Sequence, residues 1–232
     1  MGCSSSGAPR PVGSTIFIIL LGILVFGLTF ISAKKTTTAN NNSKTASTSS
    51  ASTNSTLIYL LAGGLTALWG LLNIIKTIRG LANGVDFTFM TFLRFVNGVT
   101  LIGIGGLFVV MRNPMLLTLA FAFLAFITLI FFISDIIYLV RLSKFTEVSA
   151  SSYIAIILEN LSVLLICGIA IAKFLNLMPA IVNLHWLPES LYTIAFLVSS
   201  SYDYNFLFIL TLFTTIGALM MLGKAIFQFN ND

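Results

Sequence analysis

Long runs of hydrophobic residues, separated by short polar segments, dominate the sequence. Six runs are long enough for a helix to cross a bilayer, because about 20 apolar residues span its hydrocarbon core. They lie at residues 15–32, 57–78, 89–111, 115–140, 153–175 and 205–227. The runs are continuous and lack the roughly ten-residue alternating pattern of a membrane barrel strand. The pattern therefore predicts an all-α, polytopic transmembrane helical bundle of about six spans.

Polar segments divide the chain into four parts. Residues 1–14 form a polar N-terminal segment, and residues 15–32 form an N-terminal transmembrane helix. Residues 33–56 are rich in Asn, Ser and Thr, cannot bury an apolar face, and are predicted to be a disordered linker. The membrane-embedded domain then covers residues 57–228. A cleaved signal peptide is the alternative for the first run, which is long for one.

The connection between the fifth and sixth spans contains a short apolar stretch. Residues Leu191–Val198 are too few to cross a bilayer, so we expect them to lie in the interface or to dip into it. A crossing here would move the C-terminus to the other side of the membrane. His185 and Trp186 precede this stretch, and we expect them at the outer interface, where aromatic residues gather.

Composition makes lipid the solvent for most of the chain. Hydrophobic residues make up 57% of the sequence and charged residues 8%, which is more apolar surface than a soluble domain of this size can cover. The net charge of +5 lies almost wholly at helix ends. It therefore indicates topology rather than nucleic-acid binding.

Lysine and arginine predict the orientation. From residue 57 onward, six basic residues fall on one side of a six-span bundle and two on the other. The six are Lys76, Arg79, Arg94, Arg141, Lys144 and Lys224, and the two are Arg112 and Lys173. By the positive-inside rule, we expect the N- and C-termini to be cytosolic, although Lys34 and Lys35 favour the opposite orientation. We expect the membrane to be the plasma membrane or an endomembrane.

Two segments of the membrane domain resemble each other. Residues 57–111 and 119–173 align without a gap at an offset of 62. The polar matches are Thr66 with Thr128, Asn73 with Asp135, Arg79 with Arg141, Asn97 with Glu159, Thr100 with Ser162, and Gly106 with Gly168. One interpretation is a duplicated helical hairpin with both units in the same orientation. The alternative is chance, because rare polar residues cluster near helix ends in any polytopic protein.

Five polar residues inside the spans share one depth. Asn73 and Asp135 lie near the cytosolic ends of their helices, and Arg94, Asn97 and Glu159 lie a short way into the returning helices. At about 1.5 Å per residue, they sit roughly 8–12 Å below the cytosolic interface. Charges inside a span are costly and usually face the bundle interior or water. These residues form a candidate ion, proton or headgroup site. The alternative is structural: Arg94 pairs with Asp135 or Glu159, and the asparagines hydrogen-bond between helices.

Small residues recur where two of the helices can approach closely. They are Gly63, Gly64, Ala67 and Gly70 in one span and Gly98, Gly103, Gly105 and Gly106 in the next. Close helix packing is the interpretation we favour. The Gly-Ile-Gly-Gly run lies within a span and follows no strand, so it is not predicted to bind a nucleotide.

The N-terminal region contains candidate modification sites. Gly2 fits the pattern for N-myristoylation, with Cys3 beside it for palmitoylation. Asn41 begins a glycosylation sequon in the loop that the charge count places outside. A second sequon at Asn54 lies too close to the second span to be reached.

The sequence contains no recognisable catalytic motif, so we predict a non-enzymatic protein with no cofactor and no metal site. A lone histidine, His185, is not a metal site, and Cys3 and Cys167 do not indicate a disulfide framework. The predicted role is structural, scaffolding or accessory, in contact with the lipid bilayer and with other membrane proteins or further copies of the chain, and without nucleic acid.

Two other functions remain open at this point. The first is a small channel or transporter that uses Arg94, Asp135 and Glu159. The second is a subunit of an organellar complex, which the lack of a basic, Ser/Arg-rich transit region disfavours.

Overall fold

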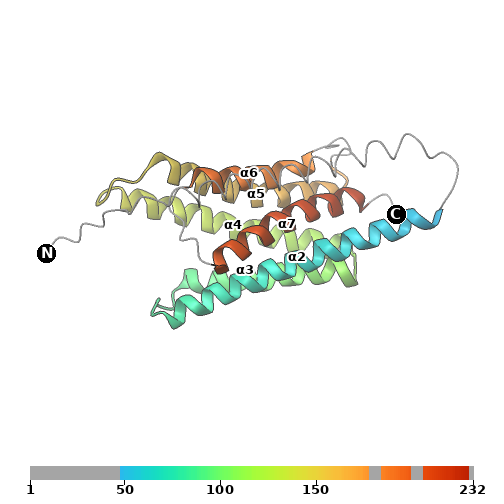
Figure 1. The fold of residues 1–232 in the computed structure, drawn as a ribbon, viewed down its shortest axis with the longest axis horizontal. Helices are drawn as coiled ribbons and strands as arrows, with labels where there is room; N and C mark the ends of the chain where they lie inside the picture. Colours follow the sequence, from blue (N-terminus) through green and yellow to red (C-terminus); the bar gives the residue numbers. More distant parts are fainter. Residues whose placement is uncertain (1–47, 178–183, 200–205, 230–232) are drawn as a thin grey trace. The chain divides into compact units, whose positions relative to one another are not determined.

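The computed structural model describes residues 48–177, 184–199 and 206–229. Within these ranges the chain forms six α-helices and one short 3₁₀ helix, with no strand (Figure 1). The helices are α2 (Thr48–Ala82), α3 (Phe89–Val110), α4 (Pro114–Leu142), α5 (Ala150–Phe174), η1 (Leu184–Trp186), α6 (Leu187–Val198) and α7 (Phe206–Gln228).

Five of the helices, all but α6 and η1, are long and apolar enough to cross a membrane. The protein is therefore an all-α, integral membrane protein, as predicted. The bounds of α3, α4, α5 and α7 agree with the predicted spans to within three residues. Helix α2 is longer than predicted: it begins at Thr48, inside the 33–56 segment, and ends at Ala82. The predicted first span, 15–32, lies outside the described residues.

Local sequence signals explain where two of the helices begin. Thr88 caps α3: its hydroxyl accepts a hydrogen bond from the Thr91 amide at 3.3 Å, and the Thr91 hydroxyl accepts one from the Thr88 amide at 3.4 Å. Asn113 caps α4, since its side-chain oxygen accepts hydrogen bonds from two amides of the first turn. Pro114 follows at the first helical position, where its missing N–H costs nothing.

Glycine allows α2 and α3 to pack with their backbones in contact. A Cβ atom added at Gly63 would lie 2.5 Å from the carbonyl oxygen of Gly105, and one added at Gly98 would lie 2.8 Å from that of Gly70. The two glycines are seven residues apart on each helix. A seven-residue spacing keeps a contact face in register over two turns. The prediction of close packing is confirmed for these four positions.

The other predicted packing glycines point elsewhere. A Cβ atom at Gly64, Gly103 or Gly106 would meet nothing within 4 Å. They neighbour the packed glycines in sequence but lie on other faces of their helices. The run of small residues therefore contains both interface and surface positions.

Aromatic side chains gather at one end of the bundle. They are Tyr59 of α2, Phe108 of α3, Phe121 of α4, Phe174 of α5, and Phe229 just after α7, with neighbouring ring centroids 4.9–6.5 Å apart. We call this end the aromatic end. Arg112 covers it, with its guanidinium 4.4 Å from the centre of the Tyr59 ring. The opposite end carries Arg79, Arg141 and Lys144, and we call it the basic end.

Helix α7 runs from the basic end to the aromatic end. Near its start, the Phe208 ring lies 5.6 Å from the Lys76 ammonium, in the last turns of α2. At its other end, Phe229 packs on Tyr59 and Phe174. Figure 1 shows the last turns of α7 at the same end of the bundle as the start of α2.

This direction of α7 corrects one prediction. Because α5 ends at the aromatic end and α7 begins at the basic end, the intervening chain must cross the bundle. Helix α6 lies inside it, packed against α5 and α7, and Ser162 in the middle of α5 donates a 2.6 Å hydrogen bond to the Pro188 carbonyl. Leu191–Val198 is thus packed within the bundle, against α5 and α7, rather than at its end. Lys224 and the end of α7 lie opposite Arg141, not beside it.

The two hairpins of the predicted repeat both form. The buried hydroxyls of Thr66 and Thr128, which the alignment matches, each donate to the carbonyl four residues earlier. The second hairpin lacks the glycine pair through which α2 and α3 pack closely, because Gly70 and Gly98 align with Phe132 and Asn160. A duplication therefore stays a prediction.

Candidate functional site

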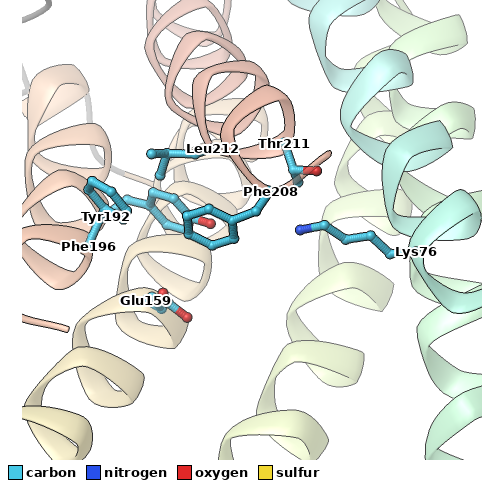
Figure 2. Close-up of a pocket in the computed structure, with 7 residues that line it drawn as sticks. All are labelled: Lys76, Glu159, Tyr192, Phe196, Phe208, Thr211 and Leu212. Atoms are coloured by element: carbon cyan, nitrogen blue, oxygen red, sulfur yellow. The ribbon is translucent and has the colours of Figure 1, made fainter. Parts of the chain in front are cut away.

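A cavity of about 150 Å³ lies between α2, α5, α6 and α7, nearer the basic end. Its lining residues are Lys76, Glu159, Tyr192, Phe196, Phe208, Thr211 and Leu212. Figure 2 shows Lys76 reaching across from α2 toward α7, while Glu159 comes from α5 on the other side. A space of this size holds a few water molecules or one group about as large as a benzene ring.

Two opposite charges face this cavity. The Lys76 ammonium and the Glu159 carboxylate attract each other electrostatically. Lys76 lies six residues before the end of α2, and Glu159 lies nine residues after the start of α5. At about 1.5 Å per residue, these positions are roughly 9 Å and 13 Å from the helix ends. The charged cavity therefore lies within one half of the membrane domain.

Hydroxyl groups complete the polar lining. Tyr192 lies near the Thr215 hydroxyl and interacts electrostatically with Glu159. Thr211 lines the cavity one turn before Thr215, and each threonine donates to a carbonyl of α7. Tyrosine and threonine hydroxyls both donate and accept hydrogen bonds. The site can therefore hold an ion, water or a small polar group between fixed dipoles.

The structure divides the predicted layer of polar residues into two clusters. Glu159 belongs to the cavity. Asp135 of α4 instead lies near Asn160 of α5 and interacts electrostatically with Arg94 of α3. The side-chain amide of Asn160 donates a 3.0 Å hydrogen bond to the Ile156 carbonyl of its own helix. Arg94 itself is exposed on its helix. This second cluster links three helices and is absent from the cavity lining.

The two predicted asparagines do not line the cavity. Asn73 is partly buried in α2, one turn before Lys76. The Oδ1 atom of Asn97 is buried in the described part of the chain and accepts no hydrogen bond there.

Sequence reasoning missed Lys76, Tyr192 and the α7 threonines as site residues. Lys76 had been interpreted only as a topology marker. The available signal was that Lys76 lies inside the predicted span 57–78 rather than after it. Tyr192 was overlooked because its segment was expected in the interface. A crossing α6 would have placed it against α5.

A further acid lies deeper in the bundle. Glu189 of α6 is 9% exposed, and its Oε2 atom accepts no hydrogen bond within the described residues. Lys224 of α7 acts electrostatically on Glu189 and on His185 of η1. Gly223 lets η1 pack closely on α7, since a Cβ atom at Gly223 would lie 2.6 Å from the His185 carbonyl oxygen. His185 is thus packed on the last turns of α7, near the aromatic end, with its ring 5.7 Å from that of Phe227.

The predicted modification sites are not among the described residues. Gly2, Cys3 and Asn41 all lie outside the described residues. Among residues 48–177, 184–199 and 206–229, no group of three His, Cys, Asp or Glu side chains is placed to hold a metal ion.

No family model, curated protein or solved structure matches this chain. Its function must therefore be argued from its own residues.

Proposed function

We propose that this protein is a small, non-enzymatic membrane transporter or channel, and that the cavity between Lys76 and Glu159 is its ion site. The supporting observation is that opposite charges from α2 and α5 line one cavity inside the membrane domain. Taking two charges out of water is costly. Intramembrane charges that face a cavity typically mark an ion or substrate pathway.

The basic residues support one orientation for this site. With α6 crossing, the basic end carries Lys76, Arg79, Arg94, Arg141 and Lys144, and the aromatic end carries Arg112, Lys173 and Lys224. Five against three still favours the basic end as cytosolic. The ion site then lies in the cytosolic half of the membrane, and the C-terminus lies on the opposite side from that predicted.

Flux through purified protein in liposomes tests this function. We expect the wild type to pass a small ion from a panel of Na⁺, K⁺, H⁺ and Cl⁻, and Glu159→Gln to fall to the level of protein-free liposomes. The matched control is Glu147→Gln, because Glu147 is exposed in the turn between α4 and α5. It should keep wild-type flux. A well-folded wild type that passes no ion would refute the proposal.

Asp135→Asn separates the two polar clusters. Because Asp135 lies outside the cavity, this variant should keep the flux. It should lower the unfolding temperature in detergent, because the attraction between Asp135 of α4 and Arg94 of α3 is lost. Loss of flux in folded Asp135→Asn with retention in Glu159→Gln would reverse our assignment of the site.

The second candidate function is a structural or accessory subunit. The observation that favours it is the cross-helix contact of Asp135, Arg94 and Asn160, which holds helices together without lining a cavity. In that role the apolar outer faces of the helices would pack against other membrane proteins or further copies of the chain. Wild-type protein without flux that co-purifies as a defined oligomer would favour this function.

A further inference from the structure

We propose that the ion handled by this protein is a proton, which passes between Glu189 and Glu159 by way of the Tyr192 hydroxyl. This inference rests on the proposed function and specifies its substrate. It starts from Glu189, an acid that the cavity itself does not include.

Glu189 lies near the middle of the membrane domain. The preceding residue, Pro188, accepts the hydrogen bond of Ser162, and Ser162 is the midpoint of α5 (Ala150–Phe174). At about 1.5 Å per residue, the midpoint of this helix is roughly 18 Å from either end. A carboxyl group at such a depth is costly to keep unless it has a function. Its buried Oε2 atom, without a hydrogen-bond partner in the described residues, is a free position for a proton.

Tyr192 connects this acid to the cavity. Residues three apart on a helix share a face, so Glu189 and Tyr192 follow one another along α6. Tyr192 and Glu159 line the same cavity. The Tyr192 hydroxyl can accept a proton from one side while donating its own to the other. In this path the Glu189 carboxyl gives its proton to the Tyr192 hydroxyl, which passes its own proton to the Glu159 carboxylate, with water in the cavity bridging the remaining gaps.

Charged groups on neighbouring helices lie at both ends of the line formed by Glu189, Tyr192 and Glu159. Toward the aromatic end, Lys224 of α7 acts electrostatically on Glu189 and on His185 of η1. Toward the basic end, Lys76 of α2 faces Glu159 of α5. Lys224 is four residues from the end of α7, and Lys76 is six from the end of α2. The line of ionisable groups thus covers most of the depth of the bundle.

Proton flux in liposomes tests the inference. Purified protein is reconstituted with a pH-sensitive dye inside, and a potassium diffusion potential drives proton movement. Wild type should acidify or alkalinise the lumen according to the sign of the potential. Glu189→Gln should reduce this flux to the level of protein-free liposomes, because the amide cannot take up and release a proton. Glu147→Gln, exposed and outside the line, should match the wild type.

Two further variants distinguish a lost proton path from a misfolded protein. Tyr192→Phe removes only the relaying hydroxyl and should reduce proton flux strongly, while Glu189→Asp, which restores a carboxyl group, should recover flux in part. Size-exclusion profiles and unfolding temperatures confirm which variants are folded.

The outcomes separate this inference from the proposed function. Wild type that passes Na⁺, K⁺ or Cl⁻ but no protons would overturn the proton inference and leave the ion site standing. Proton flux that persists in folded Glu189→Gln would overturn it as well. Wild type that passes none of the ions would refute both.

Discussion

At the residue scale, small side chains show what a sequence can and cannot predict. The glycines of α2 and α3 could be predicted to mediate packing, because small residues let the backbones of membrane helices approach closely. The face could not be predicted. Gly105 and Gly106 are adjacent, yet a Cβ atom at Gly105 would clash with the Gly63 carbonyl and the Ala67 backbone, while one at Gly106 would meet nothing.

Leucine substitutions at these two glycines should therefore differ. Gly105→Leu should destabilise the protein by about 1–3 kcal/mol, the usual cost of overpacking, measured by thermal unfolding in detergent micelles. Gly106→Leu should leave stability close to that of the wild type. Equal losses in the two variants would contradict the packing of α2 on α3.

For the ionisable residues, too, depth in the membrane could be predicted but the neighbouring side chains could not. That Asp135 and Glu159 sit inside the membrane domain could be read from hydropathy alone. Their partners could not, because partner choice depends on helix rotation and on which helices are neighbours. Asp135 interacts with Arg94 and Asn160, whereas Glu159 interacts with Lys76. The shared depth was predicted, but the division into two clusters emerges only from the packing.

At the element scale, α6 is the feature that sequence reasoning judged least well. Its 12 residues are too few to cross a bilayer alone, since about 20 are needed. The helix nevertheless lies within the bundle because α5 and α7 supply its surroundings: Ser162 donates a hydrogen bond to the Pro188 carbonyl, and α7 packs along its other side. Non-standard segments are tolerated at membrane depth only when protein covers them.

A pair of alanine substitutions on α7 tests how η1 and α6 are held. Gly223→Ala places a methyl group 2.6 Å from the His185 carbonyl oxygen and 3.2 Å from its Cβ atom. It should push η1 away and lower the unfolding temperature. Gly217→Ala, in the same helix, meets only the tip of Leu65 at 3.4 Å and should have no such effect. If both variants behave alike, η1 does not pack on α7 as described.

At the scale of the whole molecule, the described part is a bundle with two chemically different ends. The aromatic end brings rings from α2, α3, α4 and α5 and from Phe229 together, while the basic end carries most of the positive charge. The ionisable line from Lys224 to Lys76 connects them only because α6 crosses between α5 and α7. The direction of α7, the position of the C-terminus and the proton pathway therefore depend on one another.

The most direct test of this account is the side of the membrane on which the C-terminus lies. Epitope tags are placed after Asp232, in the α3–α4 turn at Asn113, and in the α4–α5 turn at Glu147, each in a separate variant, and are probed with antibody before and after selective permeabilisation. We predict that the C-terminal tag shares a side with the Asn113 tag and is opposite the Glu147 tag. A C-terminal tag on the same side as Glu147 would mean that α6 does not cross, and would contradict the account.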